Sequence, residues 1–282
     1  MSARWAPRYS RRSFLKFGAA AAAGVLALRL PQLAPRAGGV SGLRVASALP
    51  RPLPGVQLLP FPEQLLDARR YAIDAALVPA YVAAQLIQRG LLQPLPGSSG
   101  RAHDPEGYFT VPFAYRVAAL RFASERAAPR AAAWDDLWSA PGGAAWPAFG
   151  RLITGAALLR RSYSPNDAHP GHLAQAADDL GRLRARVVPG LGSAVTLVLA
   201  DPTELGQAGG LRLPAEGTML VEYDWVITGS PAQAEAARQF IDGLRPAARI
   251  LRPDLPVRLI PLMPLSRTAQ TQHDEIWAGL AG

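Results

Sequence analysis

The sequence predicts an α/β protein, on three observations. Short apolar runs bounded by proline or glycine are typical of buried strands. Longer segments with apolar residues at helical spacing alternate with these runs, an order typical of a parallel sheet covered by helices. About 245 of the 282 residues follow an N-terminal segment of different composition, and that length suits two lobes of ordinary size.

The N-terminal segment has the layout of an export signal. Residues 10–16 read Ser-Arg-Arg-Ser-Phe-Leu-Lys and resemble the twin-arginine consensus, and they lead into an apolar run from Phe17 to Leu28. That run is about a dozen residues long, whereas a membrane span needs roughly 20. A basic stretch before a short apolar run is typical of a secretion signal. We therefore predict a twin-arginine signal peptide over 1–37, either cleaved there or kept as an anchor, and a linker over 38–42.

The elements after the linker follow from the apolar pattern and its boundaries. Residues 72–78 form an apolar run that ends at Pro79, which is typical of a buried strand. Gly90 closes the next helix because glycine tolerates the left-handed conformation at a helix end. The predicted strands lie at 43–46, 56–59, 72–78, 117–122 and 195–200, with one bent strand or a strand pair at 218–227. The predicted helices lie at 62–71, 81–89, 134–138, 153–161, 170–186 and 231–244.

Composition excludes several classes of protein. The formal net charge is +9, but residues 1–37 carry seven cations and no acid, which leaves 23 basic against 21 acidic residues. A nearly neutral domain lacks the basic surface that nucleic acids require, so no nucleic-acid partner is expected. The absence of cysteine excludes disulfides, thiol catalysis, cysteine metal sites and a lipid-anchored lipoprotein.

Four stretches occur in an order that is known from one family. They are residues 72–95, residues 108–113 with 134–138, residues 163–167 with 173–183, and residues 214–220. In this order they resemble the extracellular solute-binding proteins of ABC transporters, in their spermidine/putrescine-binding branch. The resemblance implies the two-lobed periplasmic binding protein fold of type II, with the ligand cleft between the lobes and a shortened N-terminal lobe. It places lobe 1 at 43–118 plus 223–255 and lobe 2 at 119–222 plus 256–282.

The family's ligand residues carry over only in part. A polyamine receptor needs carboxylates for the ammonium groups and aromatic faces for the stem. Tyr81 matches a family tyrosine, but residues 46–49 lack the expected aromatic and acidic residues, and residues 148–152 keep only Arg151 of an acid-rich motif. The predicted ligand-binding residues are Tyr81, Tyr115, Arg116, Asp201, Glu204, Tyr223 and Asp224.

Arg116 points to a different ligand class. It falls at a predicted hinge crossing, where a guanidinium would repel a diamine and pair with a carboxylate or phosphate. The alternative is an arginine that is solvated or paired within the protein. For the three tyrosines, the alternative is ordinary packing in the cleft or core. For Asp201 and Glu204, the alternative is a place in a solvated loop.

Catalytic and metal-binding patterns lack support. His169 and His172 are the one close histidine pair, and the neighbouring sequence supplies no carboxylate triad. Asp135 and Asp136 match a surface helix of the family and not a catalytic pair. We therefore expect no enzyme, no cofactor and no metal.

The resemblance implies the periplasmic solute-binding component of an ABC importer, with a polyamine such as spermidine or putrescine as ligand. Its expected partners are a small solute, an inner-membrane permease and, during export, the Tat translocase, and we expect a monomer. Two alternatives stay open: a receptor for an anionic or neutral solute, and a non-transporting periplasmic accessory or scaffold protein.

Overall fold

The computed structural model describes most of the chain after the predicted linker. The described residues are 43–49, 56–59, 65–66, 73–95, 101–147, 149–184, 193–205, 210–244 and 254–281. The signal peptide, the linker and all but two residues of the predicted helix at 62–71 lie outside them.

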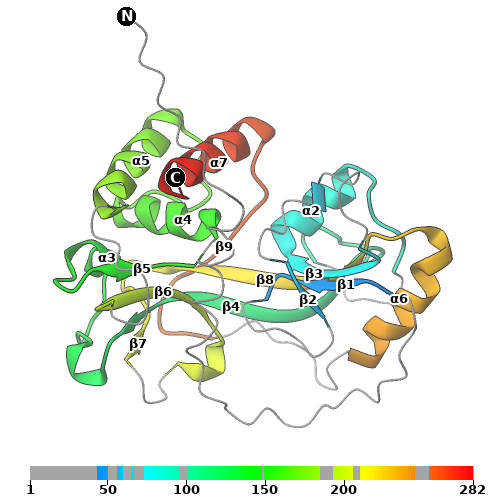
Figure 1. Cartoon of the computed structure of the whole chain (residues 1–282), viewed down its shortest axis with the longest axis horizontal. Coiled ribbons are helices and arrows are strands. Elements are labelled where there is room, and N and C mark those ends of the chain that lie inside the picture. Colours follow the sequence, from blue (N-terminus) through cyan, green and yellow to red (C-terminus); the bar gives the residue numbers. More distant parts are fainter. Residues whose placement is uncertain are drawn as a thin grey trace, which may run out of the picture.

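Within the described residues, one nine-stranded sheet runs from one end of the molecule to the other (Figure 1). Its path is β2-β1-β3-β8-β4-β6-β5, with β7 beside β4 and β9 beside β8. The strands are β1 (Val45–Ser47), β2 (Gln57–Leu58), β3 (Ala75–Pro79), β4 (Val111–Phe122), β5 (Ala144–Ala145), β6 (Val195–Ala200), β7 (Leu211–Arg212), β8 (Thr218–Ile227) and β9 (Leu259–Pro261).

The sheet is mixed, so the prediction of a parallel sheet is wrong. Strands β1, β2 and β3 pair in parallel, but β8 is antiparallel to both β3 and β4, and β4 is also antiparallel to β6 and β7. The long strands β4 and β8 run in opposite directions between the two ends of the molecule, and neighbours with opposite directions must form an antiparallel ladder. The register of this ladder shifts between Pro112 and Ala114, which marks a β-bulge.

Helices gather over the two ends of the sheet and give the molecule its two lobes (Figure 1). Helices α2 and α6 flank the end that holds β1, β2 and β3, whereas α3, α4, α5 and α7 lie around β5 and β6. The helices are α2 (Ala80–Gln88), α3 (Asp136–Ser139), α4 (Gly150–Arg160), α5 (Pro170–Arg184), α6 (Pro231–Leu244) and α7 (Arg267–Ala281), with short 3₁₀ turns η2 (Glu125–Ala127) and η3 (Pro202–Glu204).

Burial explains why most elements were predictable. All five residues of β3 are buried, as its unbroken apolar sequence predicts. Helix α2 ends before Gly90, whose φ of +63° confirms the expected left-handed cap. Helix α4 lies so close to β8 that a side chain on Gly155 would collide with the Met219 sulfur. The structure also contains β5, β7, β9 and α7, which the sequence reading missed.

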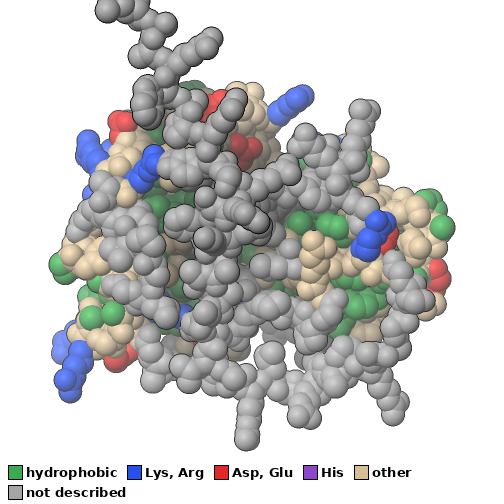
Figure 2. Space-filling model, viewed as in Figure 1, with side chains coloured by type: hydrophobic (Ala, Val, Ile, Leu, Met, Phe, Trp, Pro, Cys, Tyr) green, Lys and Arg blue, Asp and Glu red, His purple; other side chains and the backbone are tan. Residues whose placement is uncertain are grey.

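The described residues contain no helix long and apolar enough to cross a membrane. Acidic and basic side chains are scattered among the described atoms on the face in Figure 2, in keeping with the nearly neutral charge of the domain. The division into lobe 1 and lobe 2 at the stated residues stays a prediction.

Candidate functional site

The two strands that cross between the lobes carry two acids on one face. In β8, Glu222 lies opposite Tyr115 of β4, and Asp224 lies opposite Pro112. Side chains two residues apart in a strand point to the same face, so Glu222, Asp224 and Tyr115 share a face of the sheet. Because both strands link the lobes, these three side chains lie in the part of the sheet between the two lobes (Figure 1).

A loop before β4 places an arginine and a histidine on these acids. The Arg101 guanidinium lies 3.1 Å from Glu222 Oε2 and 3.2 Å from Asp224 Oδ1. It donates a hydrogen bond of 2.8 Å to the Tyr115 hydroxyl, and its central carbon lies 5.0 Å from the Tyr115 ring centroid. His103 Nε2 lies 2.9 Å from Asp224 Oδ2. The acids of β8 therefore already face an arginine and a histidine of the protein itself.

This network is largely shielded from water. The Asp224 side chain is fully buried, Arg101 is 9% exposed and Glu222 is 22% exposed. Burial alone would lower the pKa of Arg101, but the carboxylates of Asp224 and Glu222 raise it above its ordinary value. Arg101 is therefore a permanent cation in this place.

Asp104 fixes the loop that carries Arg101. Its carboxylate accepts hydrogen bonds of 2.8 to 3.0 Å from the backbone amides of Tyr108, Phe109 and Thr110 and from the Thr110 hydroxyl. Burial alone would raise the pKa of Asp104, but these hydrogen bonds lower it below its usual value. The loop therefore presents Arg101 from an anchored base.

Tyr223 lies apart from Asp224, although both were predicted to bind the ligand. Successive residues of β8 face opposite sides of the sheet, so Tyr223 shares a face with Trp225. The Trp225 ring makes edge-to-face contacts with Phe113 and with Phe240 of α6 at centroid distances of 5.8 Å. Tyr223 itself is 1% exposed, so its place is in the core.

Arg116 and Asp201 pair with each other. Val117 lies opposite Ala200, which brings Asp201, the next residue after β6, beside Arg116. Arg116 Nη1 lies 3.0 Å from Asp201 Oδ2 and donates to the Tyr115 carbonyl at 2.7 Å. Asp201 also caps η3 by accepting a hydrogen bond from the Thr203 amide, and Glu204 ends that turn. Arg116 is thus paired within the protein, which was the alternative to its role as an anion receptor.

Tyr81 marks the contact between the two lobes. It lies in the first turn of α2, and its ring stacks against Phe149, the residue before α4, at a centroid distance of 6.4 Å. The Arg151 guanidinium of α4 lies 5.5 Å from the Tyr81 centroid and donates to Asn166 Oδ1 and to the Met263 carbonyl. Arg151 is 2% exposed, so a buried cation lies where the two lobes meet.

His273 adds to this buried region but not to its charge. Burial lowers the pKa of His273 to about 3, and the nearby positive charge of Arg151 acts in the same direction. The imidazole is therefore neutral at physiological pH, and Arg151 supplies the positive charge.

The predicted absence of a metal site concerns His169 and His172. His172 Nδ1 lies 2.8 Å from Asp167 Oδ2, and its ring stacks on Tyr163 at 3.8 Å. Burial alone would raise the pKa of Asp167, but hydrogen bonds from the His169 amide and from His172 lower it. Within the described ranges no group of three or more histidines, aspartates and glutamates is placed to hold a metal ion.

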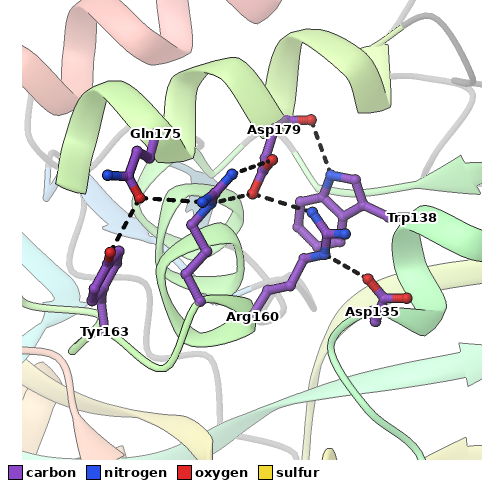
Figure 3. Close-up of polar contacts among 7 residues, drawn as sticks. Asp135, Trp138, Arg160, Tyr163, Gln175 and Asp179 are labelled. Carbon is purple, nitrogen blue, oxygen red and sulfur yellow. Dashed lines mark hydrogen bonds and ion pairs between the residues drawn. The ribbon is translucent and has the colours of Figure 1, made fainter. Parts of the chain in front are cut away.

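A second buried aspartate joins three helices of the larger helical lobe (Figure 3). Asp179 of α5 receives two hydrogen bonds from Arg161, of 2.6 and 2.9 Å, and lies 3.1 Å from Arg160. Arg160 also reaches Asp135 at 2.6 Å and covers the ring of Trp138, whose indole donates to the Asp179 carbonyl. This network fastens α3 and α4 to α5.

The predicted site residues therefore fall in four places. The structure brings Tyr115 and Asp224 together, pairs Arg116 with Asp201 near Glu204, and leaves Tyr81 and Tyr223 elsewhere. Sequence reasoning missed Arg101, His103 and Glu222 as members of one network. Glu222 lies in a motif that the sequence did single out, whereas Arg101 and His103 belong to a polar segment that offers no spacing signal.

Comparison with known proteins supports both the signal and the fold. Residues 8–27 match the family model of the TAT (twin-arginine translocation) pathway signal sequence, which confirms the predicted export signal and an exported, periplasmic protein. A search among curated proteins found no match. The solved structures that resemble the chain include ABC-transporter substrate-binding proteins, and the chain has their two-lobed α/β fold.

In three of these comparisons, the alignment covers nearly the whole chain of the similar structure. A putative spermidine/putrescine ABC transporter protein of Listeria monocytogenes aligns at 15% identity and a TM-score of 0.68, over 85% of this chain and 98% of that one. The TpPotD lipoprotein of Treponema pallidum aligns at 15% identity and a TM-score of 0.64, over 84% of this chain and 98% of that one. The spermidine/putrescine substrate-binding protein PotD of Streptococcus pneumoniae aligns at 16% identity and a TM-score of 0.57, over 85% of this chain and 98% of that one. At these identities the likeness establishes the fold.

Proposed function

We propose that the protein is the solute-binding component of an ABC importer, which captures a small solute between its lobes and delivers it to an inner-membrane permease. The observation that carries this proposal is the two-lobed fold, which aligns over 98% of the chain of a substrate-binding protein and is preceded by an export signal. A ligand that contacts both lobes favours the closed state through contacts that the open state lacks. A monomer that binds without catalysing a reaction is sufficient for this role.

A polyamine is the first candidate ligand. Spermidine and putrescine are named for the similar structures from Listeria and Streptococcus. In this chain, Glu222, Asp224 and Tyr115 supply the acids and the aromatic face that an ammonium group requires.

A small carboxylate is the second candidate, and Arg151 favours it. Its buried guanidinium lies against Tyr81 at the contact between the lobes. Arginine binds carboxylates with two parallel hydrogen bonds, so an anionic solute would suit this place better than a polyamine.

A ligand panel on the protein purified from the periplasm tests the proposal. Thermal unfolding is followed with putrescine, spermidine, amino acids and dicarboxylates, and with 1,4-butanediol as a neutral analogue of putrescine. A ligand at 100 times its Kd adds about 2.7 kcal/mol to the free energy of unfolding. A stabilising solute should also reduce the radius of gyration in solution scattering. If every solute leaves both quantities unchanged, the receptor function is wrong and the accessory or scaffold role takes its place.

A further inference from the structure

Tyr115, Glu222 and Asp224 form a cage with the chemistry of an amine-binding site. The cage offers two carboxylates, a phenolic hydroxyl and an aromatic face, all on one side of the two crossing strands. An alkylammonium or guanidinium ion binds through these same groups, by charge-assisted hydrogen bonds and by contact with the ring face.

Arg101 makes every one of these contacts. Its guanidinium pairs with both acids, donates to the hydroxyl and lies over the ring. His103 takes the second oxygen of Asp224, at 2.9 Å. The cage is thus filled by cationic and imidazole groups of the same chain, in a place where Asp224 has no exposed surface.

We propose that Arg101 is a specificity-determining residue, a tethered cation that excludes soluble amines and guanidinium compounds from the cage of Tyr115, Glu222 and Asp224. In terms of the proposed receptor function, a polyamine has to displace Arg101 before it reaches these acids. The wild-type protein therefore binds short diamines more weakly than the cage itself permits.

The attachment of Arg101 explains why it competes so well. A group held by a short segment of chain acts at an effective concentration in the millimolar range or above. Asp104 anchors that segment through the amides of Tyr108, Phe109 and Thr110, which keeps Arg101 near the cage. A soluble amine has to overcome this local concentration and the loss of its own hydration.

Removal of the guanidinium tests the proposal. The variant Arg101→Gln keeps a polar side chain, although a shorter one, and lacks the charge. We expect it to bind putrescine at least about tenfold more tightly than the wild type, by titration calorimetry at constant ionic strength. Arg101→Lys, which keeps a tethered cation, should bind putrescine as weakly as the wild type, and 1,4-butanediol should bind to none of the three.

Two control variants separate the cage from general charge effects. Arg101→Gln/Asp224→Asn lacks both the cation and one acid, so it should lose the gain in putrescine affinity. Arg238→Gln removes an arginine that pairs with Glu235 at the surface of α6, and it should bind as the wild type does. The proposal is overturned if Arg101→Gln binds putrescine no more tightly than the wild type, or if the double variant binds it equally tightly.

Folding of the variant provides an independent measurement. If Arg101→Gln is unfolded in buffer, putrescine should restore its circular dichroism spectrum whereas 1,4-butanediol should not, and failure of both overturns the proposal. A putrescine gain that depends on Asp224 supports the cage even if no natural solute stabilises the wild type, so the receptor function can fail separately. Conversely, a wild type that binds a solute while Arg101→Gln gains no putrescine affinity keeps the receptor function and removes the proposed role of Arg101.

Discussion

Two buried aspartates, Asp179 and Asp224, each face two basic side chains but differ in how those side chains reach water. Asp179 joins helices within one lobe, and the arginines that bind it are about a third exposed, at 29% and 33%. Asp224 lies on a strand that joins the lobes, and the arginine that binds it is 9% exposed. If Asp179 is lost, its arginines can turn to solvent, whereas Arg101 would stay enclosed.

The cost of breaking an ion pair therefore depends on the burial of the partner and not on that of the aspartate alone. A charge left without its partner in a buried place costs more than one that regains hydration. The Asp179 network therefore joins helices at a modest cost if it is broken. In the Asp224 network, a broken pair would leave a charge buried without its partner.

The largest expected effect is that of Asp224→Ala. This change leaves Arg101 and His103 beside an empty place, with Glu222 as the remaining acid. We expect a loss of about 3 kcal/mol in the free energy of unfolding, measured by urea denaturation. The control Glu222→Ala removes a more exposed acid and should cost less. Equal losses in the two variants would contradict the role given to burial.

Asp179→Ala should cost about 2 kcal/mol in the same measurement, because Arg160 keeps Asp135 and both arginines reach solvent. Asp178→Ala, a change at the exposed neighbouring position, should stay within about 0.5 kcal/mol of the wild type. A loss for Asp179→Ala as large as that for Asp224→Ala would remove the distinction between the two networks.

His273 lies outside the two aspartate networks and makes the free energy of unfolding depend on pH. The folded pKa of His273 is about 3, below its ordinary value of 6.5, so between these pH values the unfolded chain binds a proton that the folded chain does not. The contribution of His273 therefore makes stability fall as the pH is lowered from 6.5 toward 3, by up to about 1.4 kcal/mol per pH unit.

His273→Gln should remove about one proton from this slope between pH 6 and 4.5, as measured by urea denaturation at each pH. An unchanged slope in His273→Gln would mean that this imidazole titrates normally in the folded protein.

Burial alone would raise the pKa of Asp179, but the hydrogen bond from Arg161 and the charge of Arg160 lower it, so Asp179 loses its contribution to stability only below about pH 4.

Trp138→Phe should have the smallest effect, about 1 kcal/mol. It removes the indole hydrogen bond to the Asp179 carbonyl and weakens the contact with the Arg160 guanidinium. Urea denaturation in the Asp179→Ala background provides the check, because the carbonyl bond survives there and a similar loss is expected. A loss that disappears in that background would place the role of Trp138 in the carboxylate network instead.

Local sequence signals were sufficient for much of the fold. The apolar run before Pro79 predicted β3, and the alanine-rich segment at 231–244 predicted α6 with its observed bounds. Helix α7 was missed because its apolar residues are few, and it is held by contacts with distant parts of the chain, such as that of Trp277 with Gly150. The direction of β4 and β8 is likewise a property of long-range pairing, which a local pattern does not contain.

The candidate site was less predictable than the fold. Asp224 and Tyr115 could be named because they lie in strands that the resemblance aligned. The cation that occupies their network comes from a loop more than a hundred residues before Asp224, and no periodicity links Arg101 to that acid. Similarly, the pairing of Arg116 with Asp201 depends on the register of β4 against β6, which the sequence does not reveal.

The ladder between β4 and β8 sets the mechanical character of the molecule. The strands are paired from Val111 to Val117, so relative motion of the lobes has to be absorbed as torsion of a hydrogen-bonded ribbon. The bulge between Pro112 and Ala114 interrupts the regular hydrogen bonding of that ribbon. In terms of the proposed receptor function, closure of the lobes would twist this ribbon and store a restoring force. The stiffness of the two strands would then help to set how readily the lobes reopen.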